Sequence, residues 1–289
     1  MPPDHLLYDP EKVYSKIDYS TSTLARLTSF SRMLPDIFIG GVQKGGTSSL
    51  YYALIQHPQI IPGKIKEIFY YNITTNYEKG LSYYRQFFGT SLYKRVKRMR
   101  VGKPMHTLDA TTHTLDCKEA PARILKDVPD AKMIFILREP SARAFSQYKM
   151  AVKLGFEKAS FGQALELEEA RIKEGLSHPL SDPKHNYAYQ RLAYRSKGLY
   201  AGHLKYWFGN FPKQNVHVIN AEEFYKNPSA VFKRLCAFLN IDQNVSVKFE
   251  KMNEGGGETI DPDTLASLKE FYRPHNEALY ELLNVRYDW

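Results

Sequence analysis

The chain has 289 residues, of which 43% are hydrophobic and 25% are charged. These proportions are typical of a globular protein that buries a sizeable core in one large α/β domain or two small ones. The formal net charge of +9 favours anionic partners, whether nucleic acid, acidic glycan, phosphorylated cofactor or membrane surface. No stretch approaches the roughly 18 apolar residues of a membrane span. The first residues contain acids and prolines and lack the apolar segment of a signal peptide, so we expect a cytoplasmic protein.

Two further features bear on the compartment and the partners. Cys117 and Cys236 lie far apart and match neither a disulfide framework nor a zinc pattern, so we interpret both as small buried side chains in a reducing compartment. The run Lys94 to Lys103, "KRVKRMRVGK", has six basic residues and no acidic one. It is either a solvated helix or loop face or a patch for an acidic substrate or a membrane surface.

The first half of the chain shows two strand patterns. Residues 1 to 34 are polar without a strong period and are expected to form an N-terminal arm. Asp36 to Val42 is a short apolar run ended by glycine, which predicts a buried strand. Thr47 to His57 predicts a helix that begins at a Thr/Ser cap and stops before Pro58. Lys132 to Leu137, "KMIFIL", predicts a second buried strand, after which Pro140 opens a helix.

In the second half of the chain, strand patterns again alternate with helical ones. Residues 153 to 197 are polar and mostly helical, and could form a lid over the active face. Asn215 to Asn220 predicts a third strand, and Pro228 opens another helix. Pro262 to Leu283 predicts a helix that Pro274 breaks. Strands that alternate with helices predict an α/β fold, a single domain over residues 35 to 289 with a central parallel sheet flanked by helices.

The loop after the first strand has the composition of an anion cradle. Ligands bind at the carboxyl ends of parallel strands, and here the strand is followed by Gln43, Lys44, Gly45, Gly46, Thr47, Ser48 and Ser49. The glycines let backbone N–H groups turn toward an anion, and the next helix points its positive end at the same place. Lys44 adds a full charge. The loop therefore predicts a phosphate or sulfate site.

A second anion site is predicted at the tip of the second strand. Arg138 ends that strand, and Ser146 follows two helical turns later, so a guanidinium and a hydroxyl can hold one phosphate. The alternative is that Arg138 pairs with a carboxylate and Ser146 is incidental. A triphosphate loop would read G-x-x-x-x-G-K-[ST], whereas Lys44 here precedes the glycines. We see no acidic residue placed for magnesium, so we expect no metal site.

Together these residues resemble the sulfotransferase family that uses 3′-phosphoadenosine 5′-phosphosulfate (PAPS). "GVQKGGTSSL" resembles the 5′-phosphosulfate loop, and "LREPSARAFSQY" resembles the 3′-phosphate site with Arg138 and Ser146. "KGLYAGHLKYWFGNFP" is similar to the G-x-Y segment, with its tyrosine at Tyr200. "VHVINAEEFYKNPSAVFKRLCAFLNI" and the ending "FYRPHNEALYELLNVRYDW" are similar to later parts of the family fold. The likeness runs from about Asp36 to Trp289 and implies the family's P-loop-like fold and PAPS as the donor.

Within the family the chain looks most like the heparan sulfate type and its bacterial relatives. In "KEIFYYN" the glutamate before two aromatic residues is Glu67, which the resemblance makes the catalytic base. His113 is the alternative base, because histidine titrates near neutral pH. The implied mechanism is in-line transfer of a sulfuryl group, with Lys44 stabilising the leaving phosphate and no nucleic acid involved.

The acceptor is less determined. At "LDATTHT" Asp109 matches the acid of the glycan enzymes, but Ala110 stands where they carry lysine. The chain also lacks their cysteine-bridged lid and Lys-Gly-Arg turn, and has "NEGGGETIDP" instead. We therefore expect a hydroxyl or amine of a small molecule, with a heparan-like glycan as the alternative and a small-molecule kinase as a remoter one. Five tyrosines after Glu67 belong either to an acceptor pocket or to the core: Tyr70, Tyr71, Tyr77, Tyr83 and Tyr84.

Overall fold

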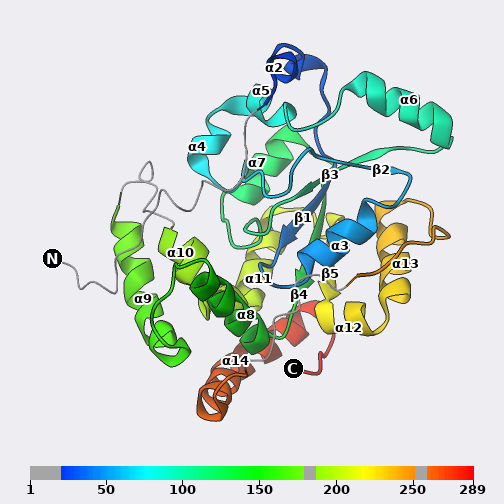
Figure 1. Ribbon diagram of the computed structural model, residues 1–289. Coiled ribbons are helices and arrows are strands. Elements are labelled where there is room, and N and C mark those ends of the chain that lie inside the picture. Colours follow the sequence, from blue (N-terminus) through cyan, green and yellow to red (C-terminus); the bar gives the residue numbers. More distant parts are fainter. Residues whose placement is uncertain (1–20, 179–186, 251–258) are drawn as a thin grey trace. The chain divides into compact units, whose positions relative to one another are not determined.

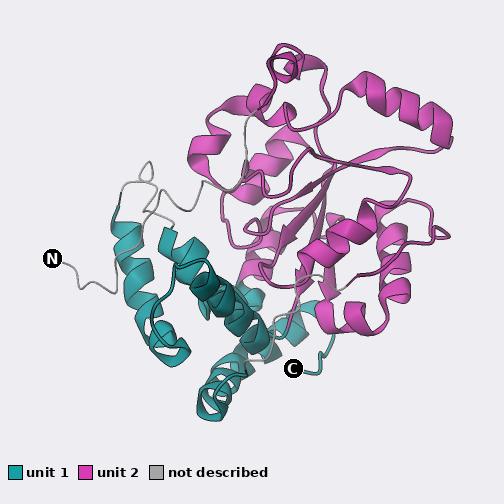
Figure 2. Cartoon of the chain, in the orientation of Figure 1, with its two compact units in different colours: residues 1–19, 139–202, 254–289 teal, residues 20–138, 203–253 magenta. Residues whose placement is uncertain are grey.

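The computed structural model describes residues 21–178, 187–250 and 259–289. Contacts within the chain divide it into two compact units (Figure 2). The sheet unit comprises residues 20–138 and 203–253, and the helical unit comprises 1–19, 139–202 and 254–289. The predicted boundary between an arm and a single domain stays a prediction. Of the arm, residues 21–34 are described and include α2 (Thr23–Leu27) and the 3-10 turn η2 (Ser29–Ser31).

The sheet unit is built on a parallel sheet with strand order β2-β3-β1-β4-β5 (Figure 1). The strands are β1 (Ile37–Gly41), β2 (Ile60–Pro62), β3 (His106–Ala110), β4 (Lys132–Leu137) and β5 (Val216–Asn220). The predicted α/β fold with a central parallel sheet is confirmed. The sheet places β1 beside β4, so the two strand ends that carry the predicted anion sites are neighbours.

Helices of the sheet unit lie between and beside these strands. They are α3 (Thr47–Leu54), α4 (Thr74–Tyr77), α5 (Gly80–Arg85), α6 (Ser91–Val101), α7 (Ala120–Asp127), α12 (Ala221–Lys226), α13 (Pro228–Leu239) and the 3-10 turn η4 (Lys213–Asn215). Most of α11 (Tyr200–Asn210) also belongs here. The basic run occupies α6, which has no buried residue, so its interpretation as a solvated face fits this helix.

The two faces of the sheet bury different side chains because successive residues of a strand point to opposite faces. On one face Ile39 and Ile134 share a buried core with Leu50 of α3 and Leu235 of α13. On the other, the Phe135 ring meets the Trp207 ring of α11 edge-on at 5.0 Å between centroids. The Trp207 indole N–H donates to the carbonyl of Leu115 at 2.9 Å. Burial on both faces holds the strand ends in fixed register.

The described part of the helical unit packs around its own apolar core. Its elements are α8 (Pro140–Lys153), α9 (Phe161–Ser177), α10 (Tyr187–Leu192), the 3-10 turn η3 (Ser196–Gly198) and α14 (Pro262–Leu283). Buried Phe161, Tyr194 and Tyr272 belong to that core. The predicted helices after Pro140 and within residues 153–197 are confirmed. Their role as a lid stays a prediction, and residues 179–186 lie outside the described ranges.

Two of the predicted helices differ from the structure in their limits or continuity. The cap of α3 is Gly46 in the left-handed region (φ 105°) and not a Thr or Ser, and the helix stops at Leu54, before His57. The helix α14 runs through Pro274 without a break. Tyr272 and Leu279 are buried on either side of Pro274, so packing on both sides outweighs the hydrogen bond that proline removes.

Both cysteines are free in this structure. Cys236 is buried and Cys117 is partly buried, and burial raises the pKa of the Cys117 thiol to about 12 and that of Cys236 to about 11. A thiol with so high a pKa is a poor nucleophile and a poor metal ligand. The structural role predicted for the cysteines fits Cys236 in full and Cys117 in part; the reducing compartment stays a prediction.

Candidate active site

The loop between β1 and α3 is shaped for close approach of its backbone to a ligand. Lys44 has a left-handed backbone (φ 66°), followed by Gly45 and by Gly46. A Cβ on Gly45 would stand 2.5 Å from the carbonyl oxygen of Ile136, and one on Gly46 would stand 2.8 Å from the Tyr225 hydroxyl. Only glycine fits at either position. The loop is therefore held tightly against β4 and α12, with no side chain on Gly45 or Gly46 to shield its amides.

The first turn of α3 completes the cradle. N–H groups in a first helical turn have no acceptor within the helix, and Gly46, as the cap, has no side chain to serve them. Thr47 and Ser49 are buried, whereas Ser48 is partly exposed. The turn thus combines amide donors, hydroxyl donors and the positive end of the helix, which suits a doubly charged phosphate group. On this observation the residues present fit the 5′-phosphosulfate end of PAPS.

Arg138 lies next to this loop. Its guanidinium donates to the Lys44 carbonyl at 3.4 Å, from the end of the neighbouring strand β4. The predicted second anion site is therefore adjacent to the first within the sheet unit. Ser146 lies on α8 and is partly buried, and Tyr200 begins α11 and is buried. Both belong to the helical unit, and their part in the second site stays a prediction.

Glu67 is held by the loop that follows β3. The Thr112 N–H donates to Glu67 Oε2 at 2.9 Å, and the Thr112 hydroxyl donates to the same oxygen at 3.1 Å. The Glu67 N–H donates to the carbonyl of Ala110 at 2.9 Å, which fixes the backbone as well. Burial, the largest effect, raises the pKa of this carboxyl. A carboxylate with a raised pKa is a better proton acceptor near neutral pH.

Lys66 connects Glu67 to the anion cradle. Its ammonium donates to the Ser48 hydroxyl at 2.9 Å and lies 5.1 Å from the centre of the Tyr51 ring. Burial lowers the pKa of Lys66. Sequence reasoning missed this lysine and also Thr112. The signals were present, because Lys66 is the neighbour of Glu67 and Thr112 is the neighbour of His113.

Backbone strain gathers at the same place. Among the described residues the non-glycine positions with positive φ are Lys44, Glu67 (φ 58°), Phe69 (φ 56°), Asn240 and Asn284. The two asparagines are ordinary helix ends. The other three carry side chains of the candidate site or adjoin it. Left-handed backbone costs about 1–3 kcal/mol per non-glycine residue and is typically retained at functional sites.

His113 follows Thr112 in the same loop. Its imidazole is buried, with Nδ1 3.9 Å from Asp116 Oδ2, and its ring centre lies 5.9 Å from that of Phe69. Thr112 holds the Glu67 carboxylate beside the loop that carries His113, so both candidate bases lie at this loop. Asp109, four residues before His113, is buried on β3, and its carboxylate accepts from the Tyr84 hydroxyl at 2.5 Å.

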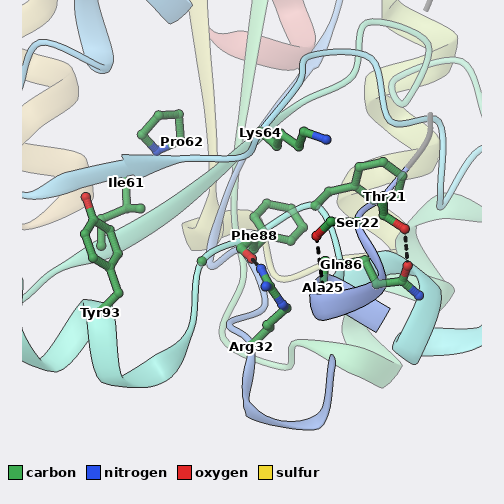
Figure 3. Close-up of a pocket in the computed structure, with 12 residues that line it drawn as sticks. Thr21, Ser22, Ala25, Arg32, Ile61, Pro62, Lys64, Gln86, Phe88 and Tyr93 are labelled. Atoms are coloured by element: carbon green, nitrogen blue, oxygen red, sulfur yellow. Dashed lines mark hydrogen bonds between the residues drawn. The ribbon is translucent and has the colours of Figure 1, made fainter. Parts of the chain in front are cut away.

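The tyrosines after Glu67 are mainly core. Tyr70, Tyr71 and Tyr84 are buried, and the rings of Tyr70 and Tyr84 stack with 4.3 Å between centroids. For these three the core interpretation holds. A cavity of about 360 Å³ lies elsewhere in the sheet unit, between α2, β2 and α6 (Figure 3), and none of the predicted site residues lines it.

The described ranges offer neither a cluster of metal ligands nor a helix suited to a bilayer. Side chains of His, Cys, Asp and Glu do not gather there in a group of three or more that could hold a metal ion. No helix there has the length and apolar character needed to cross a bilayer.

Comparisons with known proteins agree with the geometry. Residues 34–255 match the sulfotransferase domain family. Heparan sulfate glucosamine 3-O-sulfotransferase 5 of Homo sapiens is 26% identical over 292 residues, covering 91% of this chain and 76% of its own length. The 3B1 enzyme of Mus musculus is 27% identical, covering 90% of this chain and 66% of its own. The crystal structure of a sulfotransferase from Alicyclobacillus acidocaldarius is 28% identical with a TM-score of 0.69, covering 88% of this chain and 98% of that one. The chain therefore belongs to the sulfotransferase domain family and is a PAPS-dependent sulfotransferase.

Proposed function

We propose that this enzyme transfers the sulfuryl group in line to a hydroxyl or amine of its acceptor, with Glu67 as the general base. One observation carries the proposal. Thr112 fixes the Glu67 carboxylate while the adjacent Lys66 donates to Ser48 of the anion cradle. A proton acceptor and a cradle for the leaving phosphate are thus tied to one short segment, which is the positioning that group transfer needs.

Each residue has a defined task in the proposed reaction. PAPS supplies an activated sulfuryl group when bound. Glu67 takes the proton from the acceptor atom as that atom bonds to sulfur and the bond from sulfur to the bridging phosphate oxygen breaks. Lys44 and the first-turn amides of α3 neutralise the charge left on the departing phosphate.

Further residues would hold the donor. The 5′-phosphate end would be lined by Gln43, Gly45, Gly46, Thr47 and Ser48. The 3′-phosphate would be bound by Arg138 together with Ser146. Tyr200 contributes from the start of α11. The contact of Arg138 with the Lys44 carbonyl supports this arrangement, because it places a guanidinium beside the cradle.

Two acceptor classes have separate support. A sugar hydroxyl is favoured by the relatives named above, which act on heparan sulfate glucosamine according to their names. A small-molecule hydroxyl or amine is favoured by Ala110, which replaces the lysine of the glycan enzymes. We propose the small molecule as the acceptor and the sugar as its competitor.

Donor and acceptor are tested separately. Adenosine 3′,5′-bisphosphate should raise the melting temperature, whereas ATP with magnesium should not. Equal stabilisation by ATP would contradict the two-phosphate site. Labelled PAPS is then offered with panels of phenols, alcohols, amines and desulfated oligosaccharides. Transfer to oligosaccharides alone would refute the small-molecule proposal and leave the donor assignment intact.

A further inference from the structure

The helix α6 has an unusual outer face. Leu92 and Met99 lie two turns apart and therefore on one side of the helix, and each is 68% exposed. At about 100° per residue, Arg95 and Arg100 fall about 60° and 80° to either side of Leu92. An exposed apolar stripe is thus flanked by arginines on both edges.

The arginines of α6 differ from its Lys94 in their ion pairing. Lys94 faces inward, with its ammonium 3.4 Å from Asp36 Oδ2. Within the described ranges no carboxylate pairs with Arg95, Arg98 or Arg100. The segment from Ser91 to Lys103 contains no acid of its own. The surplus positive charge is complementary to an anionic surface.

A second exposed apolar group lies on α2 and just after it. Leu24 and Leu27 lie on one side of α2 and are largely exposed, and Phe30, just after it, is 79% exposed. Ser22 and Ala25 of the α2 region and Tyr93 of α6 line the same cavity, so the two helices border it together (Figure 3). In Figure 1, α2 and α6 lie at the same end of the sheet unit.

We propose that the outer faces of α6 and α2 form a docking surface for an anionic lipid bilayer. The apolar residues enter the boundary between head groups and acyl chains, and Arg95 and Arg100, at the two edges of the stripe, contact lipid phosphates. A sulfated or carboxylated glycan would use the arginines but would gain nothing from exposed Leu92 and Met99. The combination therefore favours a bilayer over a soluble polyanion. Such docking lies along a membrane surface and needs no spanning helix.

The test measures co-sedimentation of the full chain with phosphatidylcholine vesicles that contain or lack phosphatidylserine. Wild-type protein should bind the anionic vesicles and lose binding as salt rises. Two variant sets divide the contributions. The pair Leu92→Ser with Met99→Ser removes the apolar stripe, and the pair Arg95→Ala with Arg100→Ala removes the flanking charge. Each lost arginine should weaken partitioning about fivefold, and the apolar pair should weaken it at least about tenfold.

Matched controls lie outside this surface. Leu176→Ser changes an exposed leucine of α9, and Lys205→Ala removes an exposed cation of α11; both should bind vesicles as the wild type does. Unchanged melting temperatures would show that all variants fold, which is expected for the α6 variants because that helix has no buried residue. Three outcomes overturn the proposal: no binding of wild type to anionic vesicles, full binding by the apolar pair, or retention on heparin that depends on the arginines without vesicle binding.

Discussion

Replacing Gly45 with alanine tests the shape of the anion cradle. The added Cβ would stand 2.5 Å from the carbonyl oxygen of Ile136, which is 0.5 Å inside the 3.0 Å that real Cβ atoms keep. That oxygen cannot retreat, because it accepts from the Val42 N–H at 2.9 Å and β4 is paired on both sides. The loop must therefore move. Overpacking of this kind costs about 1–3 kcal/mol of unfolding free energy.

The larger effect should fall on ligand binding. Moving the loop misaligns amides that bind a charged phosphate, and each such hydrogen bond contributes about 1.5–3 kcal/mol. We expect Gly45→Ala to bind adenosine 3′,5′-bisphosphate at least about tenfold more weakly in calorimetry. Gly209→Ala in α11 is the matched control, because its Cβ would meet nothing within 4 Å. It should keep wild-type affinity. Wild-type affinity and melting in Gly45→Ala would refute the close packing of the loop.

Further predictions concern the second phosphate and the buried carboxyls. Arg138→Ala should weaken adenosine 3′,5′-bisphosphate while leaving adenosine 5′-phosphate nearly unchanged; equal affinities for wild type and variant in calorimetry would remove Arg138 from that site. Thr112→Val should raise the pKa of Glu67 further, because the hydroxyl that donates to the carboxylate is lost; the acid limb of kcat/KM then moves to higher pH, and an unmoved limb contradicts this role. Burial raises the pKa of Asp109 from 3.8 to about 6, so the folded state binds the Asp109 proton more tightly than the unfolded state does. The free energy of unfolding therefore falls as pH rises between these two pKa values. This decrease in the free energy of unfolding is up to about 3 kcal/mol. Asp109→Asn should abolish the decrease when urea unfolding is compared at about pH 4 and about pH 7. A constant difference in unfolding free energy between variant and wild type across that range would show that Asp109 does not titrate there.

The strands were predictable in proportion to their apolar content. β1, β4 and β5 are short apolar runs, and their predicted limits agree with the structure to within one residue. β3, "HTLDA", was missed because its buried residues include Thr107 and Asp109, whose polar groups are satisfied by hydrogen bonds that the sequence does not reveal. β2 was missed because it has only the residues Ile60–Pro62 and ends in proline.

Some residues of the candidate site were also predictable from the sequence, and others were not. The cradle and Arg138 follow from local patterns, since each stands at the end of a strand that the sequence predicts. The partners of Glu67 do not, because Thr112 belongs to the loop after the unpredicted β3. The contact between Lys66 and Ser48 joins residues 18 positions apart, one in the loop after β2 and the other in the first turn of α3. Pairings of this kind depend on strand order, which one sequence does not specify.

The central claim is that Glu67 removes the acceptor proton. The direct measurement is single-turnover sulfation by Glu67→Gln and by His113→Asn, each saturated with PAPS. We predict that Glu67→Gln loses about 100-fold or more of the transfer rate while its affinity for adenosine 3′,5′-bisphosphate stays near that of the wild type. His113→Asn should retain most of the rate. Near-normal transfer by Glu67→Gln, with the loss in His113→Asn instead, would contradict the account and assign the proton to His113.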